Sequence, residues 1–120
     1  MEALSSIACV IDSRLDRTFR RLKDQREKAL IAYLMAGDPS LAETEQLVLE
    51  LGKAGADVIE LGVPFSDPIA DGPVIQQAPE RALRSGTTLR AILSMVGRVR
   101  TQSDIPLVLM AYYNSIHAFG

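Results

Sequence analysis

Apolar residues in this chain fall into two kinds of run, and these predict alternating helices and strands. Residues at helical spacing near the start are Ile11, Leu15, Phe19 and Leu22. They predict an amphipathic helix that begins after Asp12 or Ser13. A short continuous run follows at residues 30–35 and ends at Gly37-Asp38-Pro39, which predicts a strand buried on both faces.

The middle of the chain repeats this order. Ser40 and Glu43 predict a capping box for a helix that stops at Gly55. Its expected inner stripe is Thr44, Leu47, Val48 and Leu51. Residues 57–61 predict a second strand, and Gly72-Pro73 predicts the start of another helix.

Turn residues divide the last third of the chain. Pro79 is expected to kink or interrupt its helix, and Gly86 to end it. Thr87 or Thr88 is the predicted cap of a further helix. The inward residues of that helix are expected to be Leu89, Ile92, Val96 and Val99. Residues 107–112 predict a third strand.

This alternating order predicts an α/β fold with a parallel sheet and helical crossovers. Residues 1–120 are expected to form a single domain, because neither a linker nor a low-complexity segment divides them. Two architectures fit, a doubly wound open sheet and part of a β/α barrel. A barrel needs about 250 residues, so these 120 residues would supply three of its eight strands. Either the chain is a fragment, or the architecture is not a closed barrel.

Composition excludes several classes of site. Hydrophobic residues make up 48% and charged residues 23%, with a net charge of −2, which does not favour nucleic-acid binding. The basic residues from Arg14 to Lys23 are interpreted as a solvated helix face. Single Cys9 and His117 exclude internal disulfides, thiolate zinc sites and multi-histidine metal sites. No apolar run approaches the roughly 20 residues that span a membrane, and a cytoplasmic location is expected.

Glu60 and Asp71 are the candidate catalytic residues. Glu60 ends a strand that otherwise reads as buried, and Asp71 follows in a turn-rich loop just before a helix start. Side chains alternate along a strand, so Val58 and Glu60 face one way while their neighbours face the other. At the carboxyl mouth of a barrel, a partly buried carboxyl group is suited to acid/base chemistry. The alternative for Glu60 is an ion pair with a basic residue on a neighbouring strand.

Simpler interpretations exist for the other candidates. Asp71 alone fits a helix cap, and Asp67 fits a turn residue before proline. Tyr33 and Tyr112 fit core packing, but each belongs to a strand face that is able to line one cavity with Glu60. A flat aromatic ligand would give both tyrosines a second use.

The segment from Glu60 to Pro73, ELGVPFSDPIADGP, closely resembles the signature of the tryptophan synthase alpha chain family. Supporting matches run from about Phe19 to Gly120. They include AGDP at 36–39, GAD at 55–57 and LMAYYN at 109–114. Residues 1–10 are expected to be an extension outside the resemblance.

The resemblance implies the first three β/α units of a (β/α)8 TIM barrel, preceded by an N-terminal helix. It implies retro-aldol cleavage of indole-3-glycerol phosphate to indole and glyceraldehyde 3-phosphate in tryptophan biosynthesis. By motif position, Glu60 matches the general acid/base and Asp71 the carboxylate that binds the indole N–H. Tyr33 and Tyr112 match positions that flank the indole ring, and Asp67 lies on a loop that faces the beta chain.

The resemblance also implies partners and departures. The implied partner is a beta chain in an alpha2-beta2 type assembly. Pyridoxal phosphate belongs to that beta chain, and neither a cofactor nor a metal is expected here. Tyr33 stands where family members commonly have phenylalanine, and the later strands with the phosphate site have no counterpart in these residues. Two alternatives remain: a truncated alpha chain that only docks on a beta chain, and an indole-forming lyase that acts alone.

Overall fold

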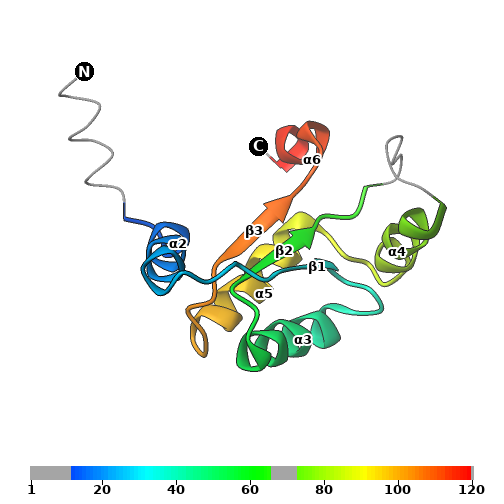
Figure 1. The fold of residues 1–120 in the computed structure, drawn as a ribbon. Coiled ribbons are helices and arrows are strands. Elements are labelled where there is room, and N and C mark those ends of the chain that lie inside the picture. Colours follow the sequence, from blue (N-terminus) through cyan, green and yellow to red (C-terminus); the bar gives the residue numbers. More distant parts are fainter. Residues whose placement is uncertain (1–11, 66–72, 120) are drawn as a thin grey trace, which may run out of the picture.

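The computed structural model describes residues 12–65 and 73–119, and it contains three strands with helices between them (Figure 1). The elements, in chain order, are α2 (Arg14–Gln25), β1 (Ile31–Met35), α3 (Leu41–Ala54), β2 (Val58–Gly62), α4 (Pro73–Arg84), α5 (Leu89–Arg100), β3 (Leu107–Met110) and α6 (Tyr113–Phe119). The alternating α/β order predicted from the sequence is therefore confirmed.

The three strands form one parallel sheet in the order β1-β2-β3. Glu60 in β2 is the register partner of Tyr33 in β1 and of Val108 in β3. Parallel neighbours of this kind need helical crossovers, which α3 supplies between β1 and β2, and α4 with α5 between β2 and β3. The carboxyl ends of all three strands consequently lie at one edge of the sheet.

The hydrophobic core lies on one face of the sheet only. Ile59 and Leu61 of β2 are fully buried against α3 and α5. The helical side chains of this layer are Val48, Ile92, Met95 and Val99, each with 0% exposure. Met95 was missing from the predicted inner stripe of its helix, although it continues the same spacing.

The prediction that β1 is buried on both faces is wrong. Ile31 and Tyr33 are 46% and 47% exposed, and Leu34, on the other face, packs at the edge of the core. Both α3 and α5 contribute to one layer, whereas the opposite face is only partly covered by the described residues. On that face Val58 is 2% exposed, but its register partner Ile31 and the next residue of that face, Tyr33, are not buried.

Most predicted helix ends are confirmed. Ser13 caps α2 in a full capping box with Asp16, and Thr88 caps α5. Gly55 ends α3 with φ of 113°. Ser40 supplies only half of its expected box, accepting a bond from the Glu43 backbone N–H at 3.2 Å. Ile11, the first of the four residues at helical spacing, lies outside the described residues.

Two element boundaries differ from the predictions. Helix α4 continues through Pro79 to Arg84, so the expected interruption is wrong. Strand β3 ends at Met110, two residues before Tyr112, because α6 begins at Tyr113 and takes the chain out of the sheet. Among the described helices, none combines the length and the apolar character needed to cross a membrane.

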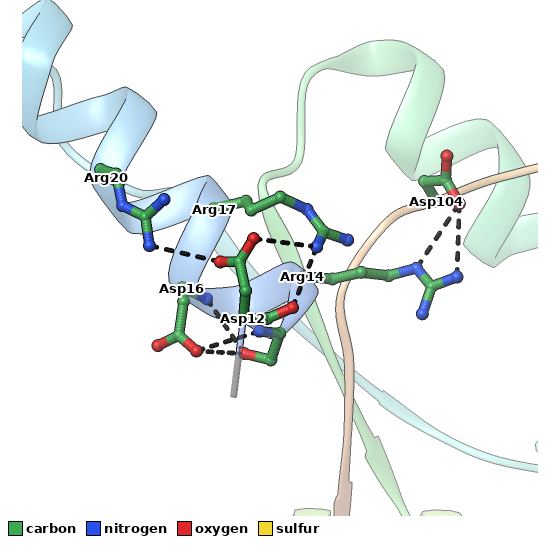
Figure 2. Close-up of polar contacts among 7 residues, drawn as sticks. Asp12, Arg14, Asp16, Arg17, Arg20 and Asp104 are labelled. Carbon is green, nitrogen blue, oxygen red and sulfur yellow. Dashed lines mark hydrogen bonds and ion pairs between the residues drawn. The ribbon is translucent and has the colours of Figure 1, made fainter. Parts of the chain in front are cut away.

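The basic residues of α2 form an exposed charged cluster, as predicted (Figure 2). Asp12 pairs with Arg17 at 3.4 Å and with Arg20 at 3.2 Å. Arg14 reaches Asp104 in the loop before β3 at 3.5 Å. Exposed pairs of this kind contribute about 0–1 kcal/mol each, so they orient α2 more than they stabilise it.

Candidate active site at the carboxyl end of the sheet

Glu60 lies on the sheet face opposite the helical core. Its neighbours Ile59 and Leu61 are fully buried among α3 and α5, whereas Glu60 is half-buried on the other side. In the described part of the chain, neither a hydrogen bond nor an ion pair engages its carboxylate. The alternative interpretation of Glu60 as a structural ion pair therefore finds no partner among these residues.

An apolar hollow of about 150 Å³ opens next to Glu60, toward the carboxyl ends of the strands. The residues that line it are Tyr33, Met35, Gly62, Val63, Phe65, Pro79, Met110, Ala111 and Tyr112. The rings of Phe65 and Tyr112 lie 5.1 Å apart between centroids. Both predicted tyrosines thus reach one hollow, as the strand faces indicated. Glu60 itself does not line it, although its register partner Tyr33 does.

Gly62 makes room for the Tyr33 side chain in this hollow. A Cβ atom at position 62 would meet the Tyr33 hydroxyl and would lie 2.9 Å from Tyr33 Cζ and 3.0 Å from Met35 Cε. The glycine allows this close approach, since a Cβ atom at position 62 would displace the end of the Tyr33 side chain. In the sequence Glu60-Leu61-Gly62, the glutamate is thus followed, on the same strand face, by a glycine that leaves room for the Tyr33 side chain.

The other predicted site residues are not all described. Asp71 and Asp67 lie outside the described residues, between β2 and α4. His117 stacks on Tyr113 at 5.7 Å between ring centroids on α6 and is not among the residues that line the hollow. Within the described ranges, His, Cys, Asp and Glu side chains do not gather in threes that would hold a metal ion.

Met35 and Met110 belong to the strand faces that were expected to line one cavity with Glu60, and both line the hollow. Sequence reasoning gave no such role to Phe65 or Pro79, which also line it. Phe65 and Pro79 come from a loop and from a helix that packs across the strand ends. Their positions depend on the tertiary fold, for which alternation along a strand gives no signal.

Comparison with known proteins identifies the family. The family model described as "Tryptophan synthase alpha chain" matches residues 19–120. The chain belongs to this family. A tryptophan synthase alpha chain from Citrifermentans bemidjiense is 59% identical over 108 residues, covering 90% of this chain and 40% of that protein. One from Geotalea uraniireducens is also 59% identical over 108 residues, with the same coverage.

Solved structures of the tryptophan synthase alpha chain family share the fold. The tryptophan synthase subunit alpha of Legionella pneumophila superposes with a TM-score of 0.89 at 46% identity, covering 92% of this chain and 42% of that one. A structure of the tryptophan synthase a2b2 complex from Pyrococcus furiosus matches with a TM-score of 0.72 at 49% identity, over 77% of this chain and 37% of that one. The three-stranded sheet is thus part of a β/α barrel. This chain spans about 40% of the length of the relatives it matches.

Proposed function

We propose that this chain carries the acid/base part of a site that cleaves indole-3-glycerol phosphate to indole and glyceraldehyde 3-phosphate. The observation that carries the proposal is the placement of Glu60, half-buried on the open sheet face beside an apolar hollow lined by Tyr33 and Tyr112. Family membership over residues 19–120 supports the choice of reaction. Residues 1–120 would form the N-terminal part of one barrel domain, with residues 1–10 as an extension.

The reaction is a retro-aldol cleavage, and its proton balance suits a single carboxyl group. The bond between indole C3 and the adjoining side-chain carbon breaks, and its electron pair goes to the indole ring. C3 gains a proton, while the hydroxyl group on that side-chain carbon loses one and becomes the aldehyde carbonyl. Glu60 would perform both transfers, each worth about 10²–10⁴ in rate.

Asp71 and the two tyrosines would bind the indole ring. Positive charge develops on the ring nitrogen when C3 is protonated, and a carboxylate at Asp71 would stabilise that charge best in a site that excludes water. Tyr33 and Tyr112 would flank the flat ring, because aromatic side chains offer large apolar contact areas. The hollow of about 150 Å³ between them supports this placement.

The test must use a completed barrel, because this chain spans about 40% of its relatives. Residues 1–120 are joined to the remaining part of the Citrifermentans bemidjiense alpha chain, and indole release is measured. We expect the joined protein to be active, and Glu60→Gln to lower kcat by about 10²-fold or more. Glu80→Gln, an exposed change on α4, is the matched control and should leave kcat unchanged.

Two results would contradict the proposal. Full activity in the Glu60→Gln protein would remove Glu60 from the chemistry. Robust turnover by residues 1–120 alone, at a rate that does not depend on the substrate phosphate, would show that the additional part of the barrel is not required. We expect negligible turnover by the 120 residues alone.

We also propose a tryptophan synthase beta chain as the partner, contacted through the loop that carries Asp67. The Pyrococcus furiosus relative, solved as an a2b2 complex, supports this partner. Pyridoxal phosphate would then belong to the beta chain. A cytoplasmic location fits the single cysteine of the chain. Light scattering of the joined protein with a beta chain tests the partnership, and a mixture that stays at the separate masses would refute it.

A further inference from the structure

Helix α4 follows β2 in the chain, but its main packing partner in the sheet is β1. Figure 1 shows α4 near the carboxyl end of β1 and away from α3, with the loop from β1 to α3 between the two helices in this view. The described side chains of α4 do not belong to the hydrophobic layer of α3 and α5, although Pro79 and Ala82 are buried. Polar contacts therefore also contribute to where this helix lies.

A two-bond ion pair joins α4 to the loop after β1. Arg81 Nε donates to Asp38 Oδ1 at 2.8 Å, and Arg81 Nη2 donates to Asp38 Oδ2 at 2.9 Å. The Asp38 side chain is only 17% exposed. The hydrogen bonds from Arg81 hold the pKa of Asp38 below its ordinary value. A bidentate pair fixes orientation as well as distance, which a single contact does not.

Three further contacts fix the same loop. The Ser85 hydroxyl donates to the Gly37 carbonyl at 3.0 Å, and the Gly37 N–H donates to Thr44 Oγ1 on α3 at 3.0 Å. Gly37 lies so close to Thr87 that a Cβ atom would overlap the threonine hydroxyl. The loop after β1 is thus held between α3 on one side and the end of α4 on the other.

The residues of α4 next to this pair form walls of the apolar hollows. Pro79 lines the hollow between Tyr33 and Tyr112. Ala78 lines a neighbouring hollow of about 280 Å³, which also touches Asp38, Tyr33 and Met35. Ala78 and Arg81 are three residues apart and so lie on one side of the helix. The ion pair therefore lies next to Ala78, which lines the same hollow as Tyr33.

We propose that Asp38 and Arg81 are positioning residues for the indole site. Their pair holds α4 against the end of β1, and so sets the width of the hollow between Pro79 and the Tyr33 ring. Neither residue touches the reacting atoms. The role of indole as occupant rests on the proposed function, whereas the positioning of α4 does not.

The structure offers a matched control, the ion pair between Arg98 on α5 and Glu45 on α3. Its Nε–Oε1 distance is 2.7 Å, and its side chains are 56% and 26% exposed. Arg98→Gln removes an ion pair that is also partly exposed, but neither Arg98 nor Glu45 lines the hollow between Tyr33 and Tyr112. Arg81→Gln and Arg98→Gln are therefore compared in the same chain.

The first measurement follows the methionine methyl groups by NMR. Met35 and Met110 line the hollow between the tyrosines, and Met95 is fully buried on α5, one turn from Arg98. We expect Arg81→Gln to shift the Met35 signal and leave Met95 in place, and Arg98→Gln to do the reverse. Asp38→Asn should reproduce the Arg81→Gln shift, since both changes break the same pair.

The second measurement titrates indole into the joined barrel. We expect Arg81→Gln to raise the indole Kd about threefold or more, and Arg98→Gln to leave it unchanged. A Met35 signal that ignores Arg81→Gln, or moves equally in both variants, would overturn the positioning role. A selective Met35 shift without any indole binding by the parent protein would keep that role and refute the occupant, and with it the proposed function.

Discussion

Gly37→Ala should destabilise this fold more than the same change at Gly86 or Gly97. Gly37 has φ of 91°, a conformation that residues with a side chain rarely adopt. It also packs against Thr87, which is 6% exposed. A Cβ atom at position 37 would overlap the Thr87 hydroxyl and lie 2.7 Å from Thr87 Cβ and 2.8 Å from its Cγ2. The change therefore carries two separate costs, one in the backbone and one in packing.

The two costs are of similar size. Forcing a side chain into the left-handed region costs about 1–2 kcal/mol. Overpacking against a branched, buried side chain costs about 1–3 kcal/mol. The alanine recovers about 0.4–1 kcal/mol by restricting the unfolded chain. We expect a net loss of roughly 2–4 kcal/mol, which in a domain of this size lowers Tm by about 4–8 °C for each kcal/mol.

Two other glycines separate the contributions. Gly86 has φ of 82° but open space around it, so Gly86→Ala carries the backbone cost alone. Gly97 lies inside α5, also in open space, so Gly97→Ala should stabilise by about 0.5–1 kcal/mol. Thermal unfolding followed by circular dichroism should give the lowest Tm for Gly37→Ala and a higher Tm for Gly86→Ala that is still below that of the parent. The Tm of Gly97→Ala should lie above that of the parent. Equal Tm values for Gly37→Ala and Gly86→Ala would refute the close approach to Thr87.

Two carboxylates give further predictions. Asp57 Oδ2 accepts a hydrogen bond from the Leu30 N–H at 2.8 Å, so Asp57→Ala should cost about 1–3 kcal/mol of stability and speed hydrogen exchange at the Leu30 amide. Asp57→Asn keeps an acceptor and should have a smaller effect on both. Unchanged exchange at Leu30 in the alanine variant would contradict this. The pKa of Asp38 is lowered from 3.8 by its bonds to Arg81, so its stabilising effect is present above pH 3.8 and is lost as pH falls through the lower folded value. The Tm difference between the parent and Asp38→Asn should therefore narrow below pH 3.8, and a difference that stays constant on acidification would refute the assignment.

The local elements could largely be predicted from the sequence. Caps and stops are encoded within a few residues, which is why Ser13, Thr88 and Gly55 end their helices as predicted. That Glu60 faces away from Ile59 and Leu61 also followed from strand alternation. Each of these features depends on neighbours in the chain, so a single sequence was enough.

The features that were missed depend on contacts between distant residues. The exposure of Ile31 and Tyr33 is set by which helices cover which face, and an apolar run reads the same whether one face or both are covered. Pro79 was expected to kink or interrupt α4, and the helix continues through it without interruption. The pair between Asp38 and Arg81 joins residues 43 positions apart, and no periodic pattern predicts such a contact.

The strict two-residue period of β2 restricts how the length of this segment can vary. A one-residue insertion or deletion inside β2, between Val58 and Glu60, would turn the glutamate into the layer of Ile92 and Met95 and turn Leu61 to the opposite face. An unpaired carboxylate in that layer would cost several kcal/mol, so the loss of the acid and the loss of the fold would come together. Length changes are compatible with this strand only when they preserve its phase or fall in the loops on either side.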